Sequence, residues 1–124
     1  HCMRNIISFC TEDLNGLKLV NDTIGHSAGD KLLQGFARLL ADAAGDDGRA
    51  YRQGGDEFAV LYEKDAEIFV QDLEKLCRSY NESSAVPISY AIGYCPLTDE
   101  GFRDVADQMM YEDKRQKKQA SSAG

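Results

Sequence analysis

The stretch Arg52-Gln53-Gly54-Gly55-Asp56-Glu57-Phe58, RQGGDEF, places two glycines and two adjacent carboxylates between two strand-like runs, Arg49 to Gln53 and Glu57 to Tyr62. Short runs of this kind around a glycine-rich turn are typical of a β-hairpin. The glycines permit backbone conformations closed to other residues and leave room for a phosphate to approach main-chain N–H groups. By composition alone, the stretch is either an ordinary hairpin turn with solvated acids or a turn that binds a ligand.

Outside the hairpin, hydrophobic periodicity predicts the overall order strand, helix, helix, hairpin, helix, strand, helix. In the last helix, Val105, Ala106, Met109 and Met110 are expected to face inward, with Tyr111 also in the core. The expected ranges are a strand from Asn5 to Cys10 that leads into Thr11-Glu12-Asp13, a helix from Leu17 to Gly25, a second helix capped by Asp30, a third capped by Asp65, a strand from Val86 to Cys95 and a last helix from Phe102 to Lys118.

This order corresponds to the split βαββαβ plan with one helix inserted after the first strand and one added at the end. The predicted fold class is α+β, βααββαβα, with a central, mostly antiparallel sheet flanked by helices. The first and third strands lie side by side in such a sheet, so Asp13 at the end of the first strand should approach Asp56 in the hairpin turn. Because a hard divalent cation takes oxygen ligands, the two carboxylates form a candidate metal site.

The bulk composition predicts a single domain over residues 1–124, since the chain has 124 residues, of which 43% are hydrophobic. A net charge of −7 argues against nonspecific binding to nucleic acid or an anionic membrane, which requires excess Lys and Arg. No apolar run approaches the ~18 residues of a membrane span. The domain is expected in the cytoplasm, either free or as the cytoplasmic portion of a membrane-anchored protein.

The four cysteines, Cys2, Cys10, Cys77 and Cys95, form no CxxC pair. Structural zinc is therefore disfavoured, and reduced, mostly buried thiols are favoured over a disulfide framework. Residues 119–124, QASSAG, are expected to be a disordered tail.

Three ordered motifs in the chain resemble the GGDEF domain of bacterial diguanylate cyclases: DLNGLKLVNDTIGHSAGD from Asp13, RQGGDEFAVL from Arg52, and ADQMMYEDK from Ala106. The similarity extends from Ile6 to Lys118. The resemblance implies a palm-like nucleotide cyclase fold related to adenylyl cyclases. It also implies condensation of two GTP molecules to cyclic di-GMP, with release of pyrophosphate, in an active site shared across a homodimer.

The resemblance implies that the acids of the first and second motifs bind metal. Asp13, Asp56 and the main-chain carbonyl of Leu14 match the ligands of Mg²⁺ (or Mn²⁺). Glu57 matches the second carboxylate of the signature, which assists metal binding or deprotonation of the 3′-hydroxyl. How Asp56 and Glu57 divide these tasks is left open.

The resemblance also implies a set of residues that bind GTP. Asn21 and Asp30 match the pair that hydrogen-bonds guanine, and a carboxylate facing the N1 and N2 donors favours guanine over adenine. Lys118 stands where the family commonly has arginine, which keeps the charge, loses the planar fork and predicts weaker phosphate binding. The remaining matches are Gly16, Leu17 and Lys18 near the phosphates, Gly54 and Gly55 over the nucleotide, and Lys114 at the triphosphate, whereas Arg115 and Lys117 are expected to be solvated.

The sequence departs from the family pattern in two places. Gly45 and Gly48 occupy the positions of an RxxD product-inhibition site, so no inhibitory site is predicted. Only twelve residues precede Asp13, which predicts a fragment, truncated at both ends, of a larger signalling protein with an upstream sensory or regulatory domain. These departures leave a second hypothesis open: a catalytically inactive GTP-binding regulatory or interaction domain of the same fold.

Overall fold

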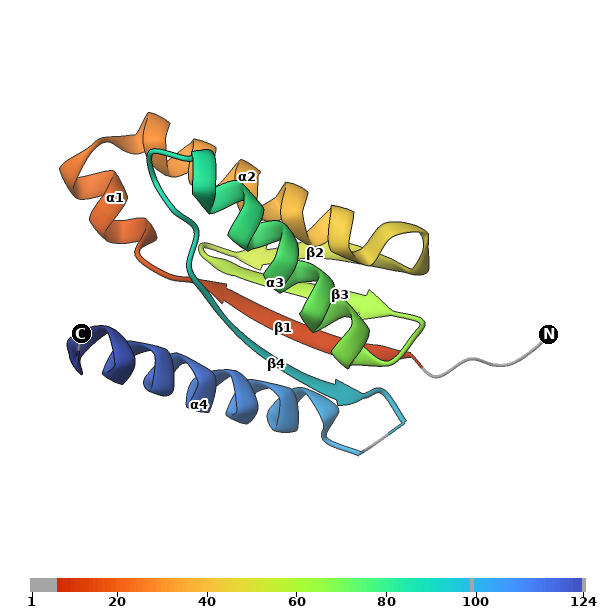
Figure 1. The fold of residues 1–124 in the computed structure, drawn as a ribbon. Coiled ribbons are helices and arrows are strands. Elements are labelled where there is room, and N and C mark those ends of the chain that lie inside the picture. The colour runs from red at the N-terminus through yellow and green to blue at the C-terminus, as the bar shows by residue number, and fades with distance from the viewer. Residues whose placement is uncertain (1–6, 99, 124) are drawn as a thin grey trace.

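The computed structural model describes residues 7–98 and 100–123, with side chains described up to residue 118 (Figure 1). Its element order confirms the predicted sequence of strands and helices. The elements are β1 (Ser8–Leu14), α1 (Leu17–Thr23), α2 (His26–Ala44), a short 3₁₀ turn η1 (Gly45–Asp47), β2 (Gly48–Gly54), β3 (Glu57–Tyr62), α3 (Ala66–Ser83), β4 (Tyr90–Pro96) and α4 (Phe102–Ala123).

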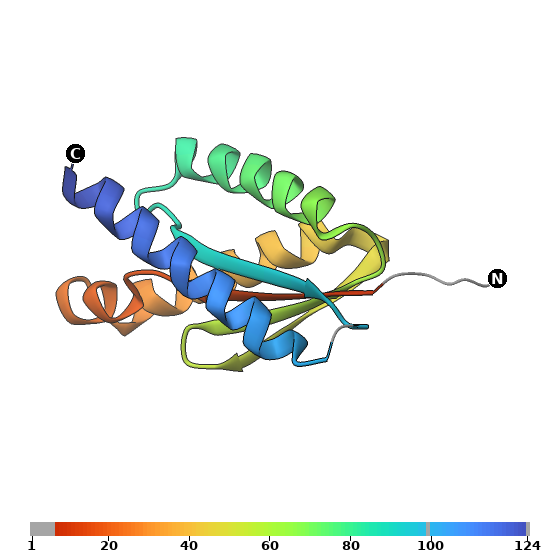
Figure 2. The same ribbon diagram turned by 90° about the horizontal axis from the view of Figure 1, so that it is seen from below.

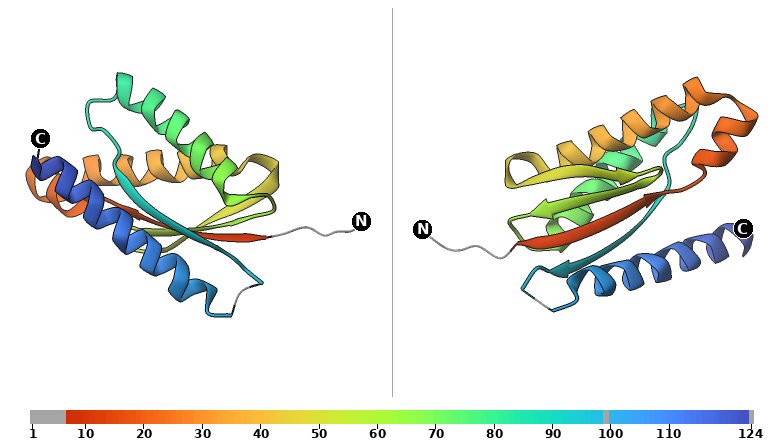
Figure 3. Two further views of the ribbon diagram at one scale, coloured as in Figure 1. Left: turned by 60° about the horizontal axis from the view of Figure 1, so that its bottom comes forward. Right: turned by 180° about the vertical axis from the view of Figure 1, so that it is seen from behind.

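The strands form one four-stranded sheet in the order β2-β3-β1-β4, in which all neighbours are antiparallel. Helices α2 and α3 cover one face, and α4 lies on the other, as Figures 2 and 3 show from different sides. The larger part of the core lies between the sheet and α2 and α3, around Phe36, Phe58 and Phe69. The predicted α+β fold class is confirmed, and the first and third strands are adjacent.

Strand β1 is longer than the hydrophobic pattern indicates, because it is hydrogen-bonded on both sides. It continues through the polar residues Thr11, Glu12 and Asp13 to Leu14, all of which are buried. A central strand has no solvent-facing edge, so its polar residues are covered by the strands and helices around it. Asp13 therefore lies one residue before the end of β1, close to its predicted place. Asn5 and Ile6 lie outside the described residues.

Two helix-cap predictions have opposite outcomes. The predicted Asp30 cap is wrong, because α2 begins four residues earlier, at His26, with Gly25 as its N-cap. The predicted Asp65 cap is confirmed: its Oδ1 accepts a hydrogen bond from Glu67 N at 3.0 Å. Asp30 is thus an exposed residue within the first turns of α2, which leaves its carboxylate available to a ligand.

The C-terminal elements differ from the prediction at their ends. Strand β4 begins at Tyr90, so Val86 lies before it rather than in it. Helix α4 continues to Ala123, past Lys118, where the prediction ended it. The disordered tail expected at residues 119–124 stays a prediction, and Gly124 lies outside the described residues.

The inward face of α4 is set by its close approach to β4. A Cβ atom on Gly93 would overlap with the carbonyl oxygen of Ala106 and lie 3.0 Å from its carbonyl carbon. Ala106 and Met110 are accordingly buried, as predicted. The inward prediction is wrong for Val105 and Met109 and for Tyr111, which are exposed by 51%, 38% and 65% respectively, because the helix presents the Ala106 side to the sheet.

The cysteines behave as small core residues. Cys10 and Cys77 are buried free thiols, and burial raises the pKa of both. Cys95 is also buried, and Cys2 lies outside the described residues. The prediction of reduced, buried thiols is confirmed for Cys10 and Cys77.

Glu12 is an ionisable residue in the core, pointing to the side of the sheet that carries Cys10 and Leu14. It is 0% exposed, and neither carboxylate oxygen has a hydrogen-bond partner among the described residues. Burial raises its pKa well above the usual range for glutamate, which favours the neutral form of the side chain. A protonated glutamate in this position costs stability whenever the unfolded chain would ionise it.

Replacing Glu12 should therefore change how stability depends on pH. The pKa of Glu12 is higher in the folded chain than in the unfolded chain. Its contribution to the free energy of unfolding is therefore greatest below the unfolded pKa of about 4.3 and falls as pH rises above that value. The Glu12→Gln variant removes this loss, so its free energy of unfolding relative to the parent should increase between pH 4.5 and pH 7.5. Urea unfolding at both values measures the difference, and an offset that is the same at both would contradict the assignment.

Candidate functional site

The tip of the β2–β3 hairpin is joined directly to the end of β1. Leu14 N donates to the Asp56 carbonyl oxygen at 2.8 Å, and Asp13 pairs with Glu57 across the two strands. Directly opposed residues of an antiparallel pair point to the same face, so the Asp13 and Glu57 side chains share the α4 side of the sheet. The predicted approach of Asp13 and the hairpin turn is confirmed.

The hairpin turn is held by glycines and by one arginine. Gly54 and Gly55 have positive φ values of 154° and 45°, conformations that residues with side chains adopt only with strain. Arg52 donates from Nε and Nη2 to the Gly55 carbonyl oxygen, at 3.1 and 2.8 Å. These two hydrogen bonds stabilise the turn. The motif did not predict this role for Arg52, which belongs to the same stretch.

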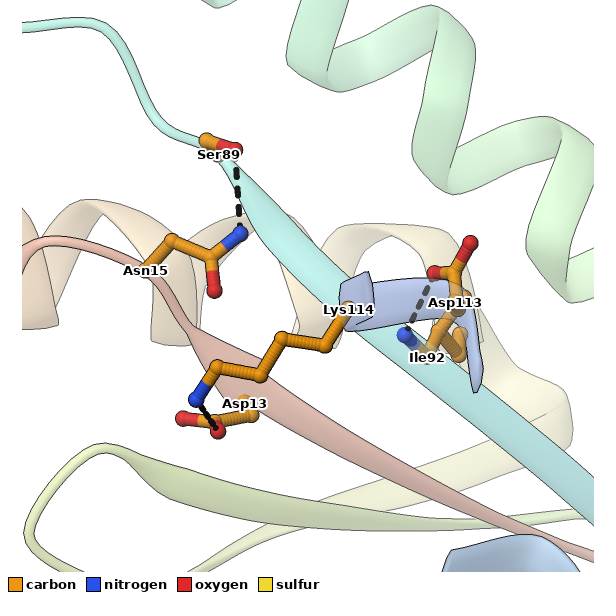
Figure 4. Close-up of polar contacts among 6 residues, drawn as sticks. All are labelled: Asp13, Asn15, Ser89, Ile92, Asp113 and Lys114. Atoms are coloured by element: carbon orange, nitrogen blue, oxygen red, sulfur yellow. Dashed lines mark hydrogen bonds and ion pairs between the residues drawn. The ribbon is translucent and has the colours of Figure 1, made fainter. Parts of the chain in front are cut away.

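Asp13 is buried, and Lys114 of α4 reaches its carboxylate, as Figure 4 shows. Lys114 Nζ donates to Asp13 Oδ2 at 2.7 Å, and the Asp13 side chain is only 10% exposed. Its other oxygen, Oδ1, is buried and has no hydrogen-bond partner within residues 7–98 and 100–123. An unpaired buried carboxylate oxygen is costly unless a ligand meets it, so this atom is a candidate ligand-binding position.

Asp56 lies close enough to Asp13 for the two carboxyl groups to interact. Partial burial raises the pKa of Asp56, and so does the negative charge of Asp13, whereas the positive charge of Lys114 opposes this rise. The pKa of Lys114 is raised in turn, mainly by its hydrogen bond to Asp13. The two acids form a negatively charged pair that one lysine neutralises only in part.

A cavity of about 260 Å³ opens beside this pair, between the sheet and the C-terminal half of α4. It brings Lys114 and Lys118 together with Asp13 and Glu57, as the motifs predict. It also includes Arg115, which was expected to be solvated, and Tyr111, which was expected in the core. The lining residues are Asp13, Glu57, Met110, Tyr111, Lys114, Arg115 and Lys118.

Helix α4 is fastened by side chains that cap the free edge of β4. Asp113 Oδ2 accepts from Ile92 N at 2.9 Å, and Lys117 Nζ donates to the Tyr90 carbonyl oxygen at 2.6 Å (Figure 4 draws the first). The two side chains also pair with each other at 3.0 Å. The prediction that Lys117 is merely solvated is wrong. Lys114 is the next residue after Asp113. The attachment of α4 to β4 therefore determines where the ammonium group of Lys114 reaches the sheet.

Unlike Lys114 and Lys118, the residues of the first motif that were predicted to bind the base and the phosphates do not line this cavity. They lie on α1 and α2 at the same end of the molecule as the hairpin tip and the C-terminal part of α4 (Figures 1 and 3). Gly16 precedes α1 with φ of 77°, Lys18 is exposed, and Leu17 packs against the core. Asn21 contacts α2 at Gly29, as described below, whereas Leu14 is buried, with 1% of its surface exposed.

Comparison with known proteins supports the resemblance of the three motifs. The family model described as "Diguanylate cyclase, GGDEF domain" matches residues 2–120.

The chain belongs to the GGDEF domain family.

Among curated relatives, this GGDEF domain is 32% identical to diguanylate cyclase DgcN of Escherichia coli over 120 residues, 85% of the chain and 29% of DgcN. Among solved structures, it resembles the GGDEF domain of Caulobacter crescentus DgcB, in complex with c-di-GMP, with a TM-score of 0.76 and 25% identity over 90% of this chain and 73% of the other. The active GGEEF domain of a Vibrio cholerae diguanylate cyclase also gives 0.76, with 27% identity over 91% and 79%. The chain spans less than a third of the length of DgcN.

The GGDEF domain offers a partial donor set for a divalent cation. Within the described part of the chain, no group of three His, Cys, Asp or Glu side chains could by itself hold a metal ion. The unpaired Asp13 Oδ1 and the neighbouring Asp56 carboxyl nevertheless fit a hard cation that completes its shell with main-chain, water or phosphate oxygens.

No helix in the described residues is long and apolar enough to cross a membrane.

The attachment of α4 to β4 can be tested with Asp113→Ala. This change leaves the Ile92 N–H without its acceptor and removes the ion pair with Lys117, so it should lower the free energy of unfolding by about 1–3 kcal/mol. Asp107→Ala on the same helix is the matched control, since Asp107 is exposed and makes no ion pair in the described structure. Urea denaturation measures both; equal stability of the two variants would show that the attachment contributes nothing.

Proposed function

We propose that this GGDEF domain is the catalytic domain of a diguanylate cyclase, which condenses two GTP molecules to cyclic di-GMP and releases two pyrophosphates. The observation that supports this most directly is the acid pair Asp13 and Asp56 beside a cavity that carries Lys114 and Lys118. Acids that can share a cation, next to lysines that can neutralise phosphate, are what phosphoryl transfer from a nucleoside triphosphate requires. The named cyclases among its relatives support the same reaction.

The nucleotide is held by two sets of side chains. Asp30 accepts hydrogen bonds from N1–H and N2–H of guanine, and Asn21 adds an amide that can donate and accept. Lys114 and Lys118 neutralise the phosphate oxygens, assisted by Lys18 and the main chain at the start of α1. The exposed, unpaired state of Asp30 and Lys18 supports these roles, because neither side chain is engaged within the described structure.

Asp13 and Asp56, with Glu57 and the Leu14 carbonyl, are the residues that would hold Mg²⁺ or Mn²⁺. When bound, the cation would supply electrostatic stabilisation of the charge that develops at the α-phosphate and the leaving oxygens. The adjacent acids Asp56 and Glu57 divide two tasks, binding the cation and accepting the proton of the 3′-hydroxyl. The raised pKa of Asp56 makes it a stronger proton acceptor than an ordinary aspartate once it is ionised.

The reaction requires a second copy of the domain. Each copy binds one GTP, and each 3′-hydroxyl attacks the α-phosphorus of the GTP in the facing copy. Two P–O bonds form and two break, and each leaving group is pyrophosphate. Because GTP is the substrate, the proposal places the domain in the cytoplasm, and an upstream sensory or regulatory domain remains a prediction.

A second candidate function is a noncatalytic GTP-binding regulatory or interaction domain. Two observations favour it: Lys118 in place of an arginine fork, and the lack of a three-carboxylate cluster in the described residues. Incubation with GTP and Mg²⁺, alone and as a fusion to a dimerising coiled coil, separates the two candidates. A folded, GTP-binding dimer that forms no cyclic di-GMP would establish the regulatory alternative.

Removing the charge of Asp56 should abolish synthesis. Asp56→Asn keeps the shape of the side chain but removes a cation ligand and a proton acceptor, so the rate should fall about 10³-fold or more, about 4 kcal/mol of transition-state stabilisation. Chromatography of cyclic di-GMP measures it. Glu63→Gln, at the opposite end of β3, is the control and should retain the parental rate; Asp56→Asn activity near the parental rate would rule out the assignment.

Nucleotide binding should depend on the cation. GTP at about 100 times its Kd stabilises a protein by about 2.7 kcal/mol, so it should raise Tm in the presence of Mg²⁺ and much less in its absence. Asp13→Asn should remove most of the Mg²⁺-dependent part of the shift. A GTP-induced increase in Tm that is equal with and without Mg²⁺ in the parent would show that the acid pair does not bind the cation of the nucleotide.

A further inference from the structure

Asn21 of α1 lies directly against Gly29 of α2, at the corner where the two helices meet. A Cβ atom on Gly29 would overlap with Asn21 Oδ1 and would lie 2.8 Å from Asn21 Cγ and 3.4 Å from Asn21 Nδ2. These are the three nearest heavy atoms, so the space beside Gly29 is occupied first of all by one amide. Any side chain at position 29 would displace Asn21 from its present direction.

The Asn21 amide occupies the space that the missing side chain of Gly29 leaves open. Asn21 is half-buried, and its side chain makes no hydrogen bond to any residue in the described structure. Neither polar atom of its amide is among the buried atoms without a partner in the described residues, so water or a ligand can reach both. The amide is therefore available to hydrogen-bond a ligand.

Asp30 follows Gly29 directly on α2, so it lies one residue along the helix from the position that Asn21 contacts. Asp30 is exposed, and the described structure assigns it no ion pair or hydrogen bond. The corner thus presents an amide and a carboxylate, both unengaged, on either side of a residue without a side chain. Glycine in a helix costs up to about 1 kcal/mol relative to alanine, so α2 is less stable here than it could be.

We propose that Gly29 is a positioning residue that sets base specificity, because only a residue without a side chain leaves the Asn21 amide where it and Asp30 jointly meet the edge of guanine. The inference rests on the proposed function and adds a determinant to its nucleotide site. Guanine presents the N1–H and N2–H donors beside the O6 acceptor, whereas adenine presents neither N2–H nor O6. A rotated Asn21 therefore loses an interaction that only GTP makes, and binding of the phosphates is unaffected.

The decisive measurement is the ratio of GTP to ATP affinity, determined by calorimetry with Mg²⁺. Gly29→Ala should weaken GTP binding about 10- to 100-fold, the equivalent of one or two hydrogen bonds in a partly buried site, and leave ATP binding nearly unchanged. Its Tm without nucleotide should equal or exceed that of the parent, because alanine favours the helix. A loss of GTP preference without a loss of stability is the result expected of a positioning residue.

Gly35 supplies a matched control on the same helix. A Cβ atom at Gly35 would lie 3.0 Å from the Tyr80 hydroxyl oxygen, remote from Asn21, so Gly35→Ala makes the same chemical change without touching the amide. It should leave the GTP-to-ATP ratio unchanged. A reduced ratio in Gly35→Ala would attribute the effect to the helix in general and overturn the proposal.

The double variant Asn21→Ala, Gly29→Ala tests whether the two residues act through one contact. Asn21→Ala alone should reproduce the loss in GTP affinity, and adding Gly29→Ala should cause no further loss, because the amide is already absent. If Gly29→Ala lowers Tm, Asn21→Ala in the same chain should restore it, since the Asn21 side chain is what the new methyl group meets. Additive losses in affinity, or an unrestored Tm, would overturn the inference.

Failure of the inference and failure of the proposed function give different results. If the parent shows no preference for GTP and Asn21→Ala does not change nucleotide binding, the proposed guanine site is wrong and the role of Gly29 falls with it. If the parent prefers GTP through Asn21 but Gly29→Ala keeps the parental ratio, the guanine site stands and only the role of Gly29 is refuted.

Discussion

The hydrogen bond from Leu14 N to the Asp56 carbonyl oxygen, 2.8 Å long, joins the end of the central strand to the tip of the hairpin. It completes the ladder in which Asp13 faces Glu57 and places Asp56 next to Asp13. The site depends on this connection, because two acids far apart in sequence can share one ligand only if their backbones are held together. Since the connection is made by main-chain atoms, it orients both acids regardless of their charge.

The positive side of the site depends on a different kind of contact. The ammonium group of Lys114 reaches Asp13 from a helix that is otherwise separate from the hairpin, so its position follows from how α4 rests on β4. Close packing at Gly93 and the capping of the β4 edge by Asp113 and Lys117 define that position. Residues with no direct contact to the acids therefore determine where the positive charge lies.

The same sheet carries polar groups whose burial has a cost. Glu12 and Asp13 are neighbours on β1, yet one points among core residues and the other toward the cavity, because successive side chains of a strand alternate between faces. Both oxygens of Glu12 lack a hydrogen-bond partner among the described residues, whereas Asp13 has one oxygen paired with Lys114 and one without a partner. The folded domain is therefore less stable than it would be with a fully apolar β1. The second of the two acids, Asp13, lines the candidate site.

The order of strands and helices, the adjacency of Asp13 and the hairpin turn, and the Asp65 cap follow from periodicity and turn residues, which are local properties of the sequence. The family of the chain follows from three short motifs.

What periodicity could not determine is what each side chain meets after folding. Val105, Met109 and Tyr111 fit an apolar helix stripe, but the Ala106–Gly93 contact rotates that stripe outward. Lys117 fits a solvated helix face, but the free edge of β4 offers it a carbonyl. The space that Gly29 leaves for Asn21 arises only when α1 and α2 pack together. These outcomes depend on the distance between elements, and that distance is set by tertiary packing rather than by the spacing of residues along the chain.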